Sequence, residues 1–169
     1  MENYRRYVLL NMNLEVRKAT LKDLPTLLKF EQGLIEAERP MDSTIKDEYI
    51  SYYDIAGFIK SEYSEVYVVA LNDEIVASGY AIIKADRHYL KHKKQAHLGF
   101  MFVPKKHRGK GFNKLIIAAL LKWCKKKVVF EIRLDVYQDN VAAIKAYKKV
   151  GFKKHMIKMR LNLEDLDIS

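Results

Sequence analysis

Residues 112–126 carry the strongest periodic signal in the chain, and it predicts one helix with a buried face. Apolar side chains recur here at i, i+3, i+4, i+7, i+8 and i+11, which is the spacing of one face of an α-helix. These positions are Phe112, Leu115, Ile116, Ala119, Leu120 and Trp123. Three lysines at 125–127 close the segment, and basic residues favour a helix C-terminus through the helix dipole. We therefore expect this helix to pack against the core.

A short strand and a turn with two glycines precede this helix. The segment HLGFMFV, residues 97–103, is a run of apolar and small residues, and Pro104 prevents it from continuing as a central strand. The turn holds Gly109 and Gly111 among basic residues. In a strand, turn and helix of this kind, free N–H groups and the positive end of the dipole point at one spot, which binds anions. Two interpretations stay open, a phosphate cradle and a solvated basic loop.

The spacing of the glycines excludes two common phosphate loops. A mononucleotide loop has the pattern GxxxxGK[ST], whereas Gly111 is followed here by Phe112 and Asn113. A dinucleotide fingerprint has the pattern GxGxxG, whereas its third glycine position is occupied by Lys114. What remains is the tetrapeptide RGKG followed by a long amphipathic helix.

The rest of the chain alternates strand-like and helix-like segments. Thr20 and Asp23 resemble a capping box at a helix start, and Asn72-Asp73 between two apolar runs predicts a two-residue hairpin turn. Strands are expected over 14–20, 66–71, 74–83, 97–103, 128–136 and 158–163, and helices over 20–40, 42–62, 112–127 and 141–150. This order predicts an α+β fold, with a mixed, mostly antiparallel sheet flanked by helices on both faces.

A second segment, LDVYQDNVAAIKAYKKVGF at 134–152, forms a known pattern together with the glycine turn. It contains a strand, Asn140, an Ala-Ile pair, Tyr147 seven residues after the Asn, and a terminal Gly-Phe. With RGKG before it, the chain resembles the GNAT N-acetyltransferase superfamily over nearly all of residues 14–163. Asn113 departs from the Gly or Ala that usually ends this family's loop. The tail after Phe152 is shorter than the usual final hairpin.

The resemblance implies that the chain binds acetyl-CoA. The strand end at 101–103 would offer main-chain groups to the pantetheine arm, with the strand splaying from the next one, and the turn would wrap the pyrophosphate. Asn140 and Tyr147 are two helical turns apart, so both can face one groove. The alternatives are a simple helix cap for Asn140 and a core aromatic for Tyr147. The expected cofactor-binding residues are Met101, Phe102, Val103, Arg108, Gly109, Lys110, Gly111, Phe112, Asn113, Lys114 and Asn140.

The resemblance also implies direct transfer of the acetyl group to a primary amine of a small molecule, a peptide or a protein. Tyr147 is the candidate acid, since a phenol with a pKa of about 10 can protonate a departing thiolate. His97 and Asp135 are the candidate bases, and an imidazole with a pKa of about 6.5 accepts protons at neutral pH. For each base the alternative is an ordinary polar residue on a strand. Deprotonation through water would need no dedicated base.

The net charge of +10 is concentrated in one part of the chain. Residues 84–127 carry 14 basic and 1 acidic side chains, whereas residues 1–83 carry 9 basic and 14 acidic ones. A local basic field attracts polyanions, either a phosphorylated cofactor or nucleic acid. The acidic, tyrosine-rich segment 31–54 suggests a cationic amine acceptor, and solvated helix faces are the alternative.

The functional alternative is a non-catalytic module that senses acetyl-CoA or binds RNA through its basic surface. Tyr89 and His92 in the basic 84–94 segment give little support for stacking on bases, so nucleic acid is the less favoured partner. A homodimer stays open. His88, His92 and His155 lack metal-ligand spacing, and no metal is expected.

The length and the cysteine content of the chain indicate its number of domains and its cellular compartment. A chain of 169 residues with 49% hydrophobic side chains fits one domain, here 14–169, after an N-terminal extension at 1–13. The single cysteine, Cys124, rules out an intramolecular disulfide and suits the cytoplasm. The N-terminal apolar run is too short for a signal-peptide core, and no stretch is long enough to span a bilayer.

Overall fold

The computed structural model describes residues 13–165 and contains one five-stranded sheet in the order β1-β2-β3-β4-β5. The first four strands pair antiparallel, and β5 pairs parallel to β4. The strands are β1 Leu14–Lys18, β2 Ser64–Leu71, β3 Glu74–Ala85, β4 Lys94–Phe102 and β5 Ile132–Leu134. The expected α+β sheet is confirmed. The N-terminal extension expected at 1–13 lies outside the described residues except for Asn13.

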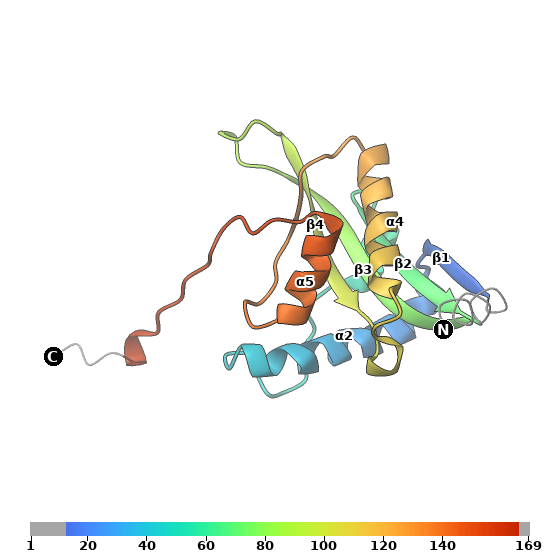
Figure 1. Cartoon of the computed structure of the whole chain (residues 1–169), viewed down its shortest axis with the longest axis horizontal. Helices are drawn as coiled ribbons and strands as arrows, with labels where there is room; N and C mark the ends of the chain where they lie inside the picture. Colours follow the sequence, from blue (N-terminus) through green and yellow to red (C-terminus); the bar gives the residue numbers. More distant parts are fainter. Residues whose placement is uncertain (1–12, 166–169) are drawn as a thin grey trace.

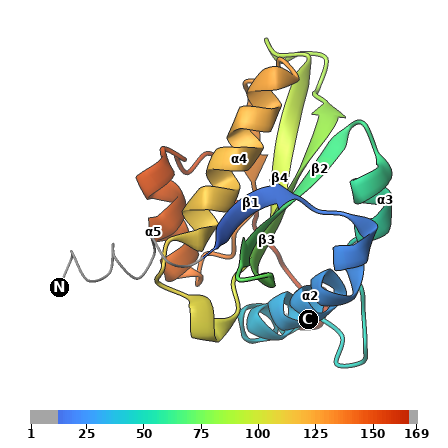
Figure 2. The same cartoon turned by 90° about the vertical axis from the view of Figure 1, so that its right-hand side faces the viewer.

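Helices cover both faces of this sheet, as predicted (Figure 1). One face packs against α4, Phe112–Lys126, with α5, Val141–Val150, beside it (Figure 2). The other face packs against α2, Leu24–Glu38, and α3, Ile55–Lys60. The six apolar positions of the predicted helix lie on α4, and four of them, Phe112, Ile116, Leu120 and Trp123, are buried.

Two local predictions agree with the structure because short-range chemistry decides them. Asn72 and Asp73 have φ angles of 49° and 66°, which is the left-handed pair that a tight hairpin between β2 and β3 requires. The Asp23 carboxylate accepts hydrogen bonds from the Thr20 backbone N–H at 2.7 Å and from the Arg17 guanidinium at 2.7 and 2.8 Å. A short 3₁₀ turn, Leu21–Asp23, then leads into α2.

The prediction of a helix over 42–62 is wrong except for α3. Asp42 accepts hydrogen bonds from the N–H and hydroxyl of Thr44, which holds a turn in place of a helix. The backbone N–H groups of Tyr52 and Tyr53 are bound by the Glu31 carboxylate of α2. Helical structure therefore begins only at Ile55, after Asp54 caps it by accepting from the Gly57 N–H at 2.8 Å.

The strands predicted over 128–136 and 158–163 are also wrong in extent. The first is reduced to β5, whose paired residues are 132–134, because Val128 turns the chain with a φ of 57°. The second forms no strand, since residues 153–162 make no backbone–backbone hydrogen bond with the rest of the described chain. Both segments have strand-like sequences, but among the described residues only 132–134 pair with a neighbouring strand, β4.

Candidate active site

The end of β4 separates from β5 and forms the first wall of the site. The two strands pair only over residues 96–98 of β4, so Gly99 to Phe102 have no partner on that side. A bulge at Phe100, with a φ of 56°, interrupts the pairing of β4 with β3. The hydroxyl of Ser78 on β3 is buried and donates to the Phe100 carbonyl at 3.2 Å, which stabilises the bulge. This separation is the splay expected beside Met101.

The segment after β4 is a short, folded loop. Arg108 donates from Nε to the Val103 carbonyl at 3.1 Å, which closes the loop at its base. Gly109 and Gly111 have φ angles of 78° and 87°, a left-handed conformation that favours glycine. A Cβ at either position would meet nothing within 4 Å, so both glycines border open space. The need for glycine here is thus conformational.

The N-terminus of α4 has no side-chain cap. Its N-cap residue is Gly111, which offers no acceptor, so the first N–H groups of the helix are not bound by a capping side chain. The Asn113 side-chain oxygen is buried without a hydrogen-bond partner among the described residues, and so is Nδ1 of His107. Uncapped N–H groups and the positive end of the helix dipole favour an anionic ligand here, whereas the unpaired Asn113 oxygen is an acceptor and does not bind an anion.

The second predicted motif lies on α5. The Asn140 side chain accepts from the Ala143 N–H at 3.1 Å, so it caps this helix. Tyr147 packs edge-to-face on Phe152, with ring centroids 5.9 Å apart. Burial, and to a smaller degree the Glu38 carboxylate at the end of α2, raise the pKa of Tyr147 to about 12. Tyr147 therefore stays protonated at neutral pH, and it lies close enough to the end of α2 for the charge of Glu38 to raise its pKa.

The two candidate bases lie near each other on the face covered by α2 and α3. His97 is half-buried on β4, and burial lowers its pKa, while the Asp135 carboxylate acts in the opposite direction. The imidazole is therefore neutral at pH 7. Burial raises the pKa of Tyr80 on β3 to about 12, and Asp135 adds to that shift. His97, Asp135 and Tyr80 thus form one group of titratable side chains.

Acidic and phenolic side chains gather where α2 ends. Burial raises the pKa of Glu38, with the Tyr52 hydroxyl acting against it, and no neighbouring cation contributes to the shift. Burial and the nearby Glu38 raise the pKa of Tyr52 to about 12. The Tyr137 hydroxyl donates to Asp42 at 3.4 Å. This cluster, Glu38, Tyr52, Asp42 and Tyr137, is called the acceptor cluster below.

The buried carboxylate of Glu31 fixes one side of the acceptor cluster. Its Oε1 accepts from the N–H groups of Tyr52 and Tyr53 at 2.8 Å each, and from the Ser51 hydroxyl at 3.1 Å. Glu31 is completely inaccessible to solvent. A charged acceptor with several short bonds holds the 51–53 segment rigidly against α2.

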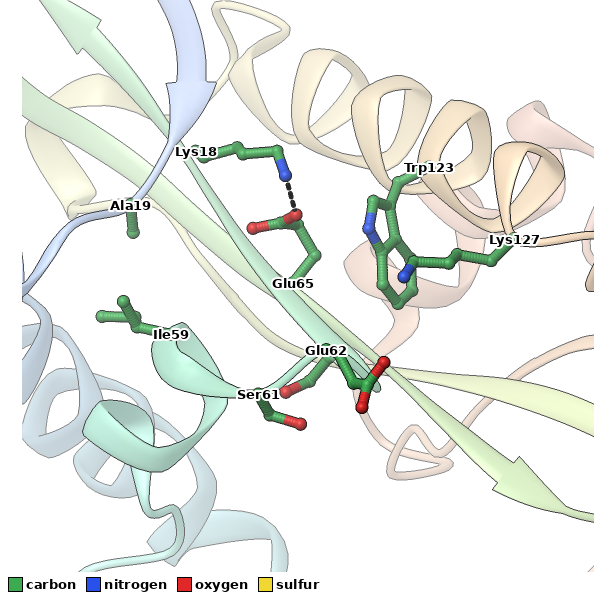
Figure 3. Close-up of a pocket in the computed structure, with 9 residues that line it drawn as sticks. Lys18, Ala19, Ile59, Ser61, Glu62, Glu65, Trp123 and Lys127 are labelled. Carbon is green, nitrogen blue, oxygen red and sulfur yellow. Dashed lines mark ion pairs between the residues drawn. The ribbon is translucent and has the colours of Figure 1, made fainter.

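Two hollows lie away from this site. One has a volume of about 300 Å³ and lies between β1, β2 and the C-terminal end of α4, opposite the glycine turn (Figure 3). There Lys127 lies over the ring of Trp123, and Lys18 pairs with Glu65. The other, about 360 Å³, is lined by residues of the 92–94 and 127–131 segments. Neither hollow contains a predicted site residue.

The described part of the chain contains neither a metal-binding cluster nor a membrane-spanning helix. Within residues 13–165 no group of three or more His, Cys, Asp or Glu side chains is arranged to hold a metal ion. In the same range no helix has both the length and the apolar character needed to cross a bilayer.

Comparison with known proteins defines the class to which this site belongs. The model of the acetyltransferase (GNAT) family matches residues 30–152, which is more than half of the chain. The chain therefore belongs to the GNAT acetyltransferase family. The match includes both segments that carried the resemblance, the glycine turn and the Asn140–Tyr147 helix.

Individual relatives are distant. The chain is 28% identical to human N-acetyltransferase 8B over 101 residues, covering 60% of this chain and 44% of that protein. It is 23% identical to spermidine N(1)-acetyltransferase from Thermoplasma acidophilum over 150 residues, 84% and 89% of the two chains. An uncharacterized N-acetyltransferase, YobR of Bacillus subtilis, is 36% identical over 55 residues, 32% of this chain and 22% of that protein. The chain thus spans less than half the length of two of these relatives.

Solved structures share the fold over almost the whole chain. A tetramutant of the BH1408 protein from Bacillus halodurans has a TM-score of 0.78 at 23% identity, covering 88% of this chain and 99% of that one. A predicted acetyltransferase from Clostridium acetobutylicum, solved with acetyl-CoA, has a TM-score of 0.68 at 18% identity, covering 91% and 99%. At these identities the likeness confirms the fold.

Sequence reasoning missed some members of the site. Tyr80 and Tyr137 gave no signal, because nothing in the sequence indicates that they lie beside Asp135 and Asp42. Glu31 was noted only as one acid in an acidic segment. The signal that could have found it is its position, since Leu27, Glu31 and Ile35 follow one helix face and all three are buried.

Proposed function

We propose that this chain is an N-acetyltransferase that moves the acetyl group of acetyl-CoA directly to a primary amine. The observation that carries the proposal is the uncapped N-terminus of α4, which follows two left-handed glycines where β4 separates from β5. Membership of the GNAT family supports the same conclusion. When bound, acetyl-CoA would supply a thioester-activated acetyl group.

The residues around the glycine turn fit a pyrophosphate. The N–H groups of Phe112, Asn113 and the turn would bind its oxygens, and Arg108, Lys110 and Lys114 would supply positive charge. Open space beside Gly109 and Gly111 leaves room for this group. Asn113 differs from the Gly or Ala usual in the family, and its unpaired Oδ1 is an acceptor that would not itself bind the pyrophosphate.

The separated strands fit an extended cofactor arm. Met101, Phe102 and Val103 would bind the pantetheine amides through main-chain groups, because no β5 residue is paired with this part of β4. A main-chain N–H of the same segment would polarise the thioester carbonyl. Asn140 would contact the arm from the start of α5 while capping that helix.

Tyr147 would donate a proton to the departing thiolate. Its raised pKa keeps the phenol protonated, and a positioned acid contributes about 100-fold or more to such a step. His97 would accept the proton of the attacking amine, because its lowered pKa leaves the imidazole neutral. Asp135 would act through His97 by stabilising the imidazolium that forms.

The acceptor would be a cationic amine bound at the acceptor cluster. Glu38 is partly desolvated, and no cation contributes to its pKa shift because the adjacent Arg39 bonds to Glu36 and to the Glu48 carbonyl, so binding of a cation would relieve the cost of its burial. Phenol rings such as Tyr52 offer a further favourable surface for an ammonium group. A relative of this chain is named for spermidine, a polyamine. The free Cys124 is in keeping with a cytoplasmic location.

The cofactor part of the proposal is tested by thermal-shift titration with acetyl-CoA, followed by assay of thiol release with a panel of amines. We expect saturable stabilisation and release of CoA that depends on the amine. Absence of stabilisation would contradict cofactor binding, and stabilisation without turnover on any amine would favour the sensing alternative. Binding to RNA that weakens steeply with salt, without an acetyl-CoA effect, would favour the nucleic-acid alternative.

The acceptor part is tested by the substitution Glu38→Gln. We expect KM for a polyamine to rise about tenfold, since a lost ion pair of this kind is worth about 1.4 kcal/mol. An aryl amine, uncharged at neutral pH, should be used as well by the variant as by the parent. Glu36→Gln is the matched control, because Glu36 is exposed on the same helix. Equal effects of both substitutions, or loss of the aryl amine activity too, would contradict a cationic acceptor site.

A further inference from the structure

The turn after α4 holds a β-branched residue in a strained backbone conformation. Val128 has a φ of 57°, and its N–H donates to the Lys125 carbonyl at 3.1 Å. The next N–H, that of Val129, donates to the Cys124 carbonyl at 3.0 Å. This is the Schellman ending of a helix, in which the left-handed residue is usually glycine, because a side chain with a Cβ is strained there. Val128 is 73% exposed, so burial of its side chain does not offset the strain.

A second large apolar side chain beside Val128 also lies in solvent. Phe130 is 72% exposed, whereas Val129 between the two is buried. Val128 and Phe130, called the apolar pair below, border the hollow of about 360 Å³ that residues 92–94 also line. Figures 1 and 2 both place the connection between β3 and β4 beside the C-terminal end of α4, away from the glycine turn. The fold thus presents two apolar side chains at this end of the molecule, and its core uses neither of them.

The same end of the molecule carries lysines without acidic partners. Within residues 13–165 the lysines that form ion pairs are Lys18, Lys46 and Lys106. The exposed lysines between β3 and β4 and in the last turn of α4 are not among them. They are Lys91, Lys93, Lys94, Lys125 and Lys126. Their charge is therefore not compensated by the described part of the chain.

The acidic side chains of the two segments that form this end, 85–94 and 125–131, are already neutralised. Arg133 binds Asp86 at 2.8 Å and Glu131 at 3.0 Å. His92 also lies 2.9 Å from Asp86. The surface around the apolar pair is consequently positive, and it attracts an anionic partner.

Three kinds of anionic partner need different things from such a surface. Protein interfaces are depleted in lysine, which does not fit a surface with five exposed lysines. Single-stranded nucleic acid stacks its bases on aromatic rings, whereas Val128 has no ring and Tyr89 is held by Arg87 at 2.6 Å. An anionic bilayer binds lysines at its headgroups and takes apolar side chains into its interfacial region. A lipid surface is therefore the partner that uses both the lysines and the apolar pair.

We propose that this end of the chain docks on anionic lipid bilayers, with the lysines at the headgroups and the apolar pair inserted at the boundary between headgroups and acyl chains. Such a contact inserts side chains and needs no membrane-spanning helix. Cytoplasmic leaflets are anionic, so a chain in the cytoplasm can meet this surface. Docking at the C-terminal end of α4 leaves the glycine turn, at the other end of that helix, open to solvent. The surface is separate from the proposed active site and does not rest on the proposed function.

The first test measures cosedimentation of the full chain with vesicles of phosphatidylcholine that contain about one-third phosphatidylserine. We expect binding that weakens as the salt concentration rises, and no binding to vesicles of phosphatidylcholine alone. The variant Lys91→Gln/Lys93→Gln/Lys125→Gln should weaken binding on the order of a hundredfold, because each lysine near an anionic surface contributes about fivefold.

The matched control removes the same charge from a different surface. Lys22, Lys29 and Lys60 are exposed on the side of α2 and α3. Changing these three lysines to Gln should weaken vesicle binding by less than about threefold. Failure of the parent chain to bind, or equal losses in the two variants, would overturn the proposal. Tighter binding to single-stranded RNA or to a polyglutamate peptide, lost in the first variant, would assign the surface to that partner and overturn it as well.

The second test separates insertion of the apolar pair from damage to the fold. Val128→Gly relieves the left-handed strain, so the midpoint of thermal unfolding should rise by about 2 °C while vesicle affinity falls about threefold. Phe130→Ser should weaken vesicle binding about tenfold or more. Tyr49→Ser is the control, because Tyr49 is 74% exposed in the 42–54 segment and should not affect binding. Unchanged affinity in both Val128→Gly and Phe130→Ser would overturn the insertion. None of these measurements uses acetyl-CoA or an amine, so they succeed or fail independently of the proposed activity.

Discussion

The two faces of the sheet have different cores. The face under α4 is mainly aliphatic, with Ile116, Leu120 and Val69 fully buried among similar side chains. The face under α2 and α3 contains a cluster of aromatic rings, in which Tyr53 lies 5.2 Å from Tyr80 and 5.6 Å from Phe100. Aliphatic side chains only pack, whereas phenols also carry hydroxyl groups and titrate. The proposed chemistry accordingly lies at the border of the aromatic face.

The largest expected effect belongs to the aliphatic face. Leu120→Ala should lower the free energy of unfolding by about 3 kcal/mol, because it leaves a cavity in a fully buried site. Urea denaturation measures the loss. At temperatures where the variant is folded, kcat and KM should be unchanged. Leu28→Ala is the control, since Leu28 on α2 is 38% exposed and should cost less than about 1 kcal/mol. A large loss of kcat in folded Leu120→Ala would contradict the division between the two faces.

The second-largest effect is expected on the rate of catalysis and not on the stability of the fold. Tyr147→Phe should lower kcat by about 100-fold, because it removes the proposed acid, and it should leave stabilisation by acetyl-CoA unchanged. The raised pKa keeps Tyr147 protonated, so the loss should be constant from about pH 6 to 9. Tyr67→Phe on β2 is the control for loss of a half-buried phenol and should be fully active. An unchanged turnover in Tyr147→Phe would remove this residue from the mechanism.

A smaller loss of stability is expected when the Glu31 carboxylate, which holds the aromatic face together, is replaced. Glu31→Gln keeps the size of the side chain but loses the charge that the N–H groups of Tyr52 and Tyr53 share. We expect a loss of about 2 kcal/mol in unfolding free energy, the usual range for hydrogen bonds to charged groups. Chemical denaturation would detect it, and KM for the amine should rise because Tyr52 is less well positioned. Glu36→Gln, exposed on the same helix, should change stability by less than about 0.5 kcal/mol.

The smallest effect is a pH dependence at the start of α2. Hydrogen bonds from Arg17, together with those from Thr20, lower the pKa of Asp23 to about 2, against about 4 in an unfolded chain. A lowered pKa stabilises the fold above the unfolded value, and that contribution is lost as pH falls from about 4 through 2. Thermal unfolding between these pH values should fall less steeply for Asp23→Asn. The exposed Asp47→Asn serves as control, and identical slopes for parent and Asp23→Asn would contradict this linkage.

Much of the fold was predictable because local chemistry decides it. The apolar spacing of α4, the Asn72-Asp73 turn and the Thr20–Asp23 contact each involve residues a few positions apart. The same holds for the glycine turn, where left-handed φ angles favour glycine. The helix predicted over 42–62 failed because Glu31, distant in sequence, binds the backbone of 52 and 53. The apolar spacing of residues 42–62 could not reveal that the Glu31 carboxylate binds the backbone N–H groups of this segment.

The sequence by itself determined the two motifs of this protein, the glycine turn before α4 and the Asn140–Tyr147 helix, because their spacing is set by helix and turn geometry. Only the tertiary structure decided that β4 parts from β5 beside the turn, and that Tyr147 lies near Glu38. It also decided that the strand-like residues 158–163 stay without a partner. Strand pairing and burial depend on what the rest of the chain places beside a segment. No segment carries that information alone.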